Sequence, residues 1–274
     1  MQFLKRLFDF YIDASVHVAL AVLSLLHVTD ILLNIPIDHH LNLFVFFGSI
    51  SAYNFIKYGV EAEKYILVAT RYHKNIQFFS IIALIIALYH VFFLSRDAIC
   101  FMIAMVLMTG LYAIPVLPSM KNLRNFGGLK IFIVSFVWSG TTVVLPALAT
   151  FTPISWDIII EFIQRFLLVL ILLVPFEIRD LAYDAPELRT LPQRIGVSNT
   201  RIFGSFAVVI FYVLTFLKDN LTIIDGIGKG VLFLALGFTM LFTEKVQKKY
   251  FASFWVEAIP IIWWGLLVVL LLFI

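Results

Sequence analysis

Hydrophobic and polar positions alternate along this chain in long blocks. Stretches of about 20 mainly apolar residues are separated by short polar segments that carry most of the charges. A helix of about 20 such residues is long enough to cross the hydrocarbon core of a membrane. The pattern therefore predicts an all-α bundle of about nine membrane-spanning helices, at residues 14–34, 40–57, 76–95, 97–117, 130–151, 157–178, 201–218, 227–244 and 252–274.

The first ten residues differ from these blocks because they mix Phe and Leu with Lys5 and Arg6. This mixture is typical of a short helix that lies in the membrane interface, with its apolar side chains in lipid and its cations at the headgroups. No small-x-small cleavage site follows the first apolar block, so we do not expect a removable signal peptide.

Lys and Arg are distributed unevenly between the two sides that these spans define. With the N-terminus placed inside, 16 of them fall in inside segments, three (Arg96, Lys218 and Lys229) fall outside, and Arg165 lies within a span. Cytoplasmic loops carry such an excess of basic residues. We therefore expect an integral membrane protein of the bacterial inner membrane, whose N-terminus and whose loops after the second and sixth spans are cytoplasmic.

Composition supports lipid as the main solvent of this chain. Of 274 residues, 62% are hydrophobic and 14% are charged, whereas a soluble domain has about 25% charged residues. No soluble segment of useful size is present, so we expect residues 1–274 to form a single polytopic membrane domain that contacts lipid and binds no nucleic acid. The one cysteine, Cys100, excludes an internal disulfide and a multi-cysteine metal site.

Candidate chemistry gathers where the sixth span ends. Glu177, Asp180 and Asp184 are spaced three and four apart, which places them on one face of a helix. Carboxylates at the end of a membrane helix are costly and indicate a function. Paired carboxylates with waters and phosphates form a typical Mg²⁺ site, and Arg189 and Arg194 could hold the far side of a phosphate. The alternative is a solvated helix end with weak Asp–Arg pairs, and the pattern alone leaves both open.

The segment from Asp180 to Gly196 resembles a known motif. Asp180-x-x-x-Asp184, followed by Arg-Thr-Leu-Pro at 189–192 and by Gly196, is similar to the second aspartate-rich motif of the UbiA-type intramembrane prenyltransferases. The resemblance implies nine transmembrane helices in one bundle. It also implies transfer of an isoprenyl group from its diphosphate to a hydrophobic acceptor, such as an aromatic quinone precursor, with Mg²⁺ held by Asp180, Asp184 and Glu177.

The first motif of that family, N-D-x-x-D after the second helix, is only partly present. Asn54 matches, but Phe55 and Tyr58 stand where the family has aspartates. We hypothesise that Lys57 takes the place of a metal and neutralises the diphosphate directly, with Asn54 and Tyr58 beside it. Because Glu61 lies four residues further on, the alternative is a surface Lys57–Glu61 pair.

A weaker resemblance concerns the region before the fifth span. Tyr112 and the basic residues Lys121 and Arg124 are similar to a Tyr and Lys-Arg region of the family, which would add them to the substrate site. The alternative is the ordinary basic charge of a cytoplasmic loop.

Two other functions remain compatible with the sequence. The missing aspartates favour a catalytically inactive relative that binds a prenyl lipid or a partner protein. Charged residues within spans, here Asp30 and Glu257, are instead the signal of a small transporter. The third intramembrane feature, Glu161 with Arg165, is spaced i,i+4 and is expected to form a mutually neutralising pair that faces the bundle.

Overall fold

The computed structural model describes residues 2–60, 71–113, 129–184 and 186–273, and in these ranges the protein is built of helices and turns without a strand. The first half contains α1 (Gln2–Asp13), α2 (Val16–Leu33), α3 (His39–Asn54) with the π-helix η1 (Phe55–Val60), α4 (Arg71–Val91) and α5 (Arg96–Ala113). The second half contains α6 (Leu129–Ser139), η3 (Gly140–Val144), α7 (Leu145–Ala149), α8 (Trp156–Asp180), η4 (Pro186–Leu188), α9 (Leu191–Val213), η5 (Leu214–Leu217), α10 (Ile223–Phe242), η6 (Phe251–Val256) and α11 (Ile259–Phe273).

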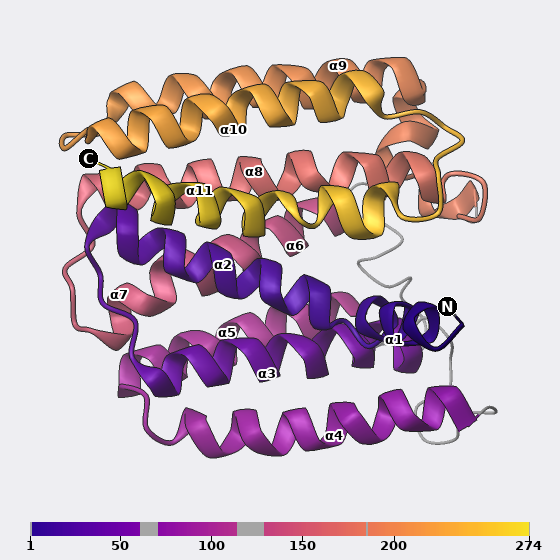
Figure 1. Ribbon diagram of the computed structural model, residues 1–274, viewed down its shortest axis with the longest axis horizontal. Coiled ribbons are helices and arrows are strands. Elements are labelled where there is room, and N and C mark those ends of the chain that lie inside the picture. The colour runs from indigo at the N-terminus through magenta and orange to yellow at the C-terminus, as the bar shows by residue number, and fades with distance from the viewer. Residues whose placement is uncertain (1, 61–70, 114–128, 185, 274) are drawn as a thin grey trace.

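The long helices lie side by side in one bundle (Figure 1). α2 packs against α3 and α11, α3 against α4, and α8 against both α6 and α9. The N-terminus, the link from α8 to α9 and the link from α10 to η6 lie at the same end of the bundle, on the right of Figure 1. We call this the basic end, because it carries Lys5, Arg6, Arg189, Arg194, Lys245, Lys248 and Lys249.

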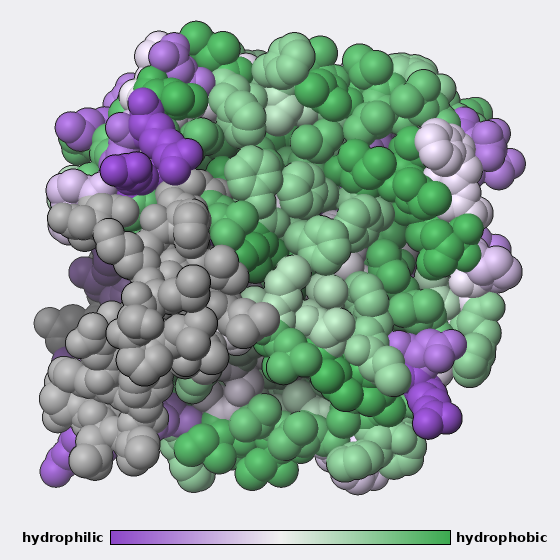
Figure 2. Space-filling view, turned by 180° about the vertical axis from the view of Figure 1, so that it is seen from behind, coloured by the Kyte–Doolittle hydropathy of each residue, from purple (hydrophilic) through white to green (hydrophobic). Residues whose placement is uncertain are grey.

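The predicted spans coincide with helices throughout the described ranges. Seven helical segments are long and apolar enough to cross a membrane, and apolar side chains cover the middle of the face in Figure 2, with hydrophilic ones toward both ends. Of the other two, α3 has 16 residues before η1 continues it, and α5 begins at Arg96 and Asp97. The protein is therefore an integral membrane protein, and the count of nine spans stays a prediction.

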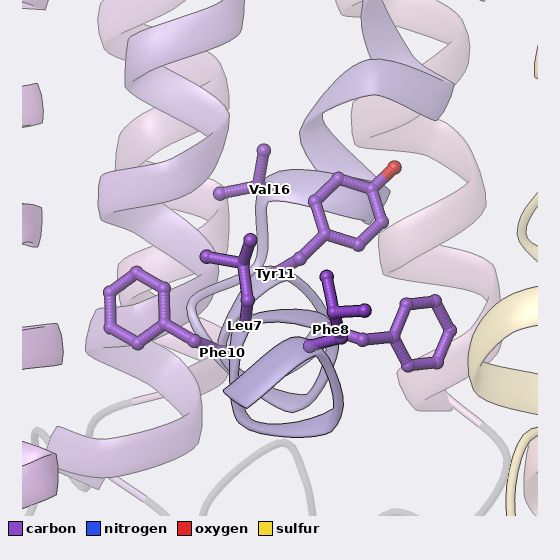
Figure 3. A pocket seen from close by; sticks show the side chains of 6 residues that line it. Leu7, Phe8, Phe10, Tyr11 and Val16 are labelled. Atoms are coloured by element: carbon purple, nitrogen blue, oxygen red, sulfur yellow. The ribbon is translucent and has the colours of Figure 1, made fainter. Parts of the chain in front are cut away.

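The expected N-terminal helix is present as α1. Its exposed side includes Phe3, Leu4 and Leu7. Further side chains of α1 and Val16 line an open apolar pocket, in which Phe8 and Tyr11 lie on one side and Phe10 on the other (Figure 3). The apolar residues of α1 thus face both the bundle and its surroundings, as an interfacial helix requires.

Arg165 is the largest fully buried side chain of the described residues. It forms the predicted ion pair with Glu161, at 3.0 Å, and also donates to the Leu25 carbonyl at 2.6 Å and to Thr142 Oγ1 at 3.3 Å. Its guanidinium lies 5.5 Å from the Trp263 ring centroid. One side chain of α8 thereby contacts α2, η3 and α11.

The π-helical segment η3 meets the same network. At Gly140 a Cβ atom would approach Phe101 Cζ to 3.0 Å, so glycine permits close packing of η3 against α5. The π-helical register changes the backbone pairing here, and the Thr142 carbonyl accepts a hydrogen bond from Thr29 Oγ1 at 2.7 Å. The distorted backbone is thus satisfied by a neighbouring helix.

Two lysines extend the ion pair into a network. Lys218 and Lys229 each lie within 3.0 Å of Glu161 Oε2, and each also pairs with Asp225, at 2.7 and 2.8 Å. All four side chains are at most 1% exposed. The sequence predicts Lys218 and Lys229 to be charges of outside segments. In the structure both are buried counter-ions of Glu161 and Asp225, because charges inside a membrane bundle need partners.

Uncharged and acidic groups complete this network at the end of the bundle opposite the basic end. Gln164 accepts from Lys229 and donates to the Phe211 carbonyl and to Thr215. Asp157, at the start of α8, accepts from the backbone amides of Asp219 and Asn220 at 2.7 and 3.1 Å. The network therefore joins α8 to α9, α10 and the link between them.

We expect Glu161→Gln to destabilise the protein by about 3–5 kcal/mol, because it leaves three buried cations with one fewer carboxylate. Lys229→Met should cost less, since Glu161 keeps Arg165 and Lys218. The unfolding temperatures of the purified variants measure this order of stability, and Glu244→Gln, at an exposed position, is the control. Equal unfolding temperatures for Glu161→Gln and the control would contradict the account.

Candidate functional site

The second motif lies at the basic end, where α8 ends. Asp180 is the last residue of α8, and its carboxylate accepts two hydrogen bonds from Arg179, at 2.7 and 3.2 Å. Its side chain is 29% exposed, so a ligand can reach it. The chain then makes one more turn, in which the Asp184 amide donates to the Asp180 carbonyl at 2.9 Å.

Glu177 is placed differently from the two aspartates. It is 3% exposed, and one of its carboxylate oxygens lies 4.0 Å from Lys130 Nζ. Among the residues that the structure describes, no group of three His, Cys, Asp or Glu side chains could hold a metal ion. The expected metal set of Glu177, Asp180 and Asp184 therefore stays a prediction.

Asp180 and Asp184 still offer a suitable donor set for Mg²⁺. This ion prefers carboxylate oxygens and usually takes one or two of them, together with waters and substrate phosphates. Asp180 and Asp184 are both partly exposed, and a turn of three residues separates them. The chemistry of these residues fits a Mg²⁺ ion whose remaining ligands come from a phosphate group.

The loop after Asp184 is held against the start of α9. Gln193 accepts from the Thr190 amide at 2.9 Å and donates to the Asp184 carbonyl at 3.3 Å. Arg189 has a positive φ of 46° and an exposed side chain, and Arg194 is also exposed. The segment thus places two exposed cations within ten residues of Asp184, and their contact with a phosphate stays a prediction.

Asn54, the matching residue of the first motif, is engaged in packing. Its side chain is buried and accepts from Ser15 Oγ at 2.7 Å. Its amide donates to the Ala14 carbonyl at 3.0 Å and to Ser80 Oγ at 2.8 Å. Asn54 therefore links the junction of α1 and α2 to α3 and α4. These contacts use both the oxygen and the nitrogen of its side-chain amide.

Lys57 and Tyr58 contact a residue that sequence reasoning missed. Lys57 Nζ lies 3.7 Å from Asp13 Oδ1, Tyr58 donates to the Asp13 carbonyl at 2.9 Å, and Tyr72 donates to Asp13 Oδ2 at 2.9 Å. No local pattern links Asp13 to Lys57, because 44 residues separate them. The alternative partner of Lys57, Glu61, lies outside the described residues.

The two motif regions approach one another at Glu257. The charges that act on this carboxylate are those of Lys57, beside the first motif, and Arg179, beside the second. These two cations are more than 120 residues apart in sequence. The fold therefore brings Lys57 and Arg179 near enough to one acidic side chain for both charges to act on it.

The helix α1 is fastened at two points across this region. Asp13 joins it to η1 and α4, whereas Asp9 accepts from Tyr250 at 2.7 Å and from Lys249 at 3.1 Å. The hydrogen bond from Tyr250, with that from Lys249, holds the pKa of Asp9 below its usual range. Between the two points is a pocket of about 460 Å³ lined by Arg6, Asp9, Asp13, Tyr72 and Lys249.

The side chains of three residues of the expected substrate site lie outside the part of the chain that the structure describes. Tyr112 lies in the last turn of α5, and only its backbone is described. Lys121 and Arg124 lie outside the described residues. Their part in a substrate site stays a prediction.

Comparison with solved structures identifies the fold. The apo structure of a UbiA homologue from Aeropyrum pernix K1 matches with a TM-score of 0.67 at 13% identity, over 93% of this chain and 98% of that chain. A structure reported for digeranylgeranylglyceryl phosphate synthase in membranes matches with a TM-score of 0.58 at 19% identity, over 97% of this chain and 96% of the other. The resemblance predicted from the sequence is thus confirmed for the fold, which is of the UbiA type.

Comparisons based on sequence add nothing to this result. No family model matches the chain, and no curated protein is significantly similar to it.

We expect the docking of α1 to depend on pH through Asp9. Because the folded pKa of Asp9 is lowered, its contribution is present above the ordinary value of 3.8 and is lost as the pH falls through the lowered value. Hydrogen-exchange protection of the α1 amides, compared at pH 6 and pH 3, should fall in the unmodified protein. In Asp9→Asn the protection should be low at both values, and unchanged protection in that variant would refute the role of Asp9.

Proposed function

We propose that this protein is a UbiA-type prenyltransferase, which transfers an isoprenyl group from its diphosphate to a hydrophobic acceptor within the membrane. The observation that carries the proposal is the UbiA-type bundle itself, which has Lys57 of the first motif region and Asp180 of the second partly exposed at its basic end. The motif loops would then face the cytoplasm, in a bacterial inner membrane, and residues 1–274 would act as a single domain.

The diphosphate would bind between the two motif regions. Asp180 and Asp184 would hold Mg²⁺, which offsets the negative charge of the leaving diphosphate. Lys57, whose side chain is 42% exposed, would contact the diphosphate from the side of η1. Arg189 and Arg194 would contact it from the loop before and within α9, as donors aimed where negative charge develops.

The prenyl chain would lie among apolar and aromatic side chains. Tyr53 and Trp138 pack edge to face in the interior, with ring centroids 6.2 Å apart. Aromatic faces attract cations, so this pair could stabilise the allylic cation that forms when the diphosphate leaves. The surrounding bundle would keep water from that cation.

A catalytically inactive relative is the second candidate. It is favoured by the contacts that neutralise both motifs within the protein, since Asp13 pairs with Lys57 and Arg179 pairs with Asp180. Such a protein would bind a prenyl lipid or a partner without transferring the group. The transporter alternative is disfavoured by the UbiA-type fold of the bundle.

Binding of geranylgeranyl diphosphate to the protein in nanodiscs tests the proposal. We expect Mg²⁺-dependent binding that Asp180→Asn/Asp184→Asn weakens by at least about 10-fold, the effect of losing hydrogen-bonded charge. Asp97→Asn, at the exposed start of α5, is the control and should bind normally. Binding that does not depend on Mg²⁺, or no binding by the unmodified protein, would contradict the proposal.

The contact between Asp13 and Lys57 gives a second expectation. Because Asp13 competes with the diphosphate for Lys57, Asp13→Asn should tighten diphosphate binding and Lys57→Ala should weaken it. Both side chains are about 40% exposed, and exposed ion pairs are worth at most about 1 kcal/mol, or about 5-fold in affinity. The same binding assay measures both variants, and unaltered affinity in Lys57→Ala would show that Lys57 does not contact the diphosphate.

A further inference from the structure

A charged pocket at the basic end contains none of the groups that would bind the diphosphate. It has a volume of about 460 Å³ and is lined by Arg6, Asp9 and Asp13 of α1, by Tyr72 of α4, and by Lys249 of the link from α10 to η6. The three residues of α1 are spaced i, i+3 and i+7, so they share one face of that helix. Ligand sites in proteins have volumes of about 300–1,000 Å³, so this pocket is large enough to hold a ligand group.

The two carboxylates of the pocket are already neutralised by the protein. Asp9 accepts a hydrogen bond from Lys249 Nζ at 3.1 Å. Asp13 accepts one from Tyr72 at 2.9 Å, and its other carboxylate oxygen lies 3.7 Å from Lys57 Nζ. Neither carboxylate therefore needs a positively charged group from a ligand.

Positive charge is left over in the pocket. Arg6 is exposed, and within the described ranges its guanidinium has no ion-pair or hydrogen-bond partner. The cations Arg6, Lys57 and Lys249 thus face only the carboxylates of Asp9 and Asp13. The Lys249 side chain is also 68% exposed, and a guanidinium presents a planar set of donors that fits phosphate oxygens. The pocket is therefore suited to one phosphate anion.

The surface of α1 beside Arg6 is apolar. Phe3, three residues before Arg6, and Leu7, directly after it, are 76% and 57% exposed. Phe10, four residues after Arg6, lies edge to face on Tyr72 of the charged pocket, with ring centroids 6.2 Å apart. Leu7 and Phe10 also line the open apolar pocket of α1 (Figure 3). A ligand with its phosphate at Arg6 would thus have apolar surface next to it for hydrocarbon chains.

We propose that this pocket binds the headgroup of an anionic phospholipid from the membrane leaflet at the basic end. The phosphate oxygens accept hydrogen bonds from Arg6 and Lys249, and the acyl chains lie along Phe3 and Leu7. A zwitterionic headgroup is disfavoured, because its ammonium group would add positive charge to a pocket whose carboxylates are already paired. The lipid thereby holds α1 at the membrane interface, in addition to the contacts that α1 makes with the bundle.

Native mass spectrometry of the purified protein in detergent tests the proposal, because it resolves the first bound lipid. The protein is titrated with dioleoyl phosphatidylglycerol, which is anionic, and with dioleoyl phosphatidylcholine, which has the same acyl chains and a zwitterionic headgroup. We expect the first phosphatidylglycerol to bind at least about 10-fold more tightly, which is the effect of a hydrogen bond between charged groups. Equal affinity for the two lipids would overturn the proposal.

Arg6→Gln and Lys5→Gln form a matched pair of variants, since each removes one cation from α1 and only Arg6 lines the pocket. Arg6→Gln should weaken phosphatidylglycerol binding by at least about 10-fold and leave phosphatidylcholine binding unchanged. Lys5→Gln should weaken phosphatidylglycerol binding distinctly less. The unfolding temperature should not change in either variant, because both positions are exposed. An equal loss of phosphatidylglycerol affinity in the two variants would show attraction by general surface charge and would overturn the site.

Two further ligands distinguish the lipid from other sources of phosphate. Inorganic phosphate in large excess should not displace phosphatidylglycerol, because it lacks the acyl chains, and displacement would assign the pocket to free phosphate instead. Arg6→Gln should bind geranylgeranyl diphosphate with Mg²⁺ as the unmodified protein does, because Lys57, Asp180 and Asp184 are intact. A loss of diphosphate binding in Arg6→Gln would make the pocket part of the diphosphate site and would overturn the lipid site.

Discussion

A charge inside a membrane bundle must be neutralised by other groups of the protein, and this constraint determines how the helices are held together. Arg165 and Glu161 of α8 are buried at 1% exposure. Glu161 also pairs with Lys218 and Lys229, and both lysines pair in turn with Asp225, on α10 and the link before it. Removing Glu161 leaves buried cations short of a carboxylate, and its contacts together with those of Arg165 fix α8 against α2, η3, α10 and α11 at one end of the bundle.

At the basic end the charges are arranged differently. Asp180 and Lys57 are each paired with one neighbour and remain 29% and 42% exposed, and Glu257 has no ion-pair partner among the described residues. Exposed pairs of this kind are weak, so an incoming phosphate can compete for them. The closed network at one end holds the helices, and the open groups at the other end are free to bind ligands. This division is the physical basis of the proposed prenyltransferase site.

The sequence predicts the helices well and the contacts between them poorly. Long apolar blocks specify helices because the backbone must satisfy its own hydrogen bonds in lipid, and the Glu161–Arg165 pair follows from its i,i+4 spacing. The burial of Lys218 and the contact of Asp13 with Lys57 depend on tertiary packing, which no local pattern encodes. The π-helical segments η3 and η6 were also missed, since the same residues suit an α-helix. Of the three carboxylates expected on one helix face, Asp180 ends α8, Asp184 lies in the turn beyond it, and Glu177 is buried near Lys130.

An experimental structure with Mg²⁺ and a thio-substituted, unreactive isoprenyl diphosphate tests the central claim most directly. The account predicts diphosphate density between Lys57 and the pair Asp180 and Asp184, with the prenyl chain running toward Tyr53 and Trp138. Density for the diphosphate elsewhere, such as in the pocket beside Arg6 and Lys249, would contradict the assignment of the site.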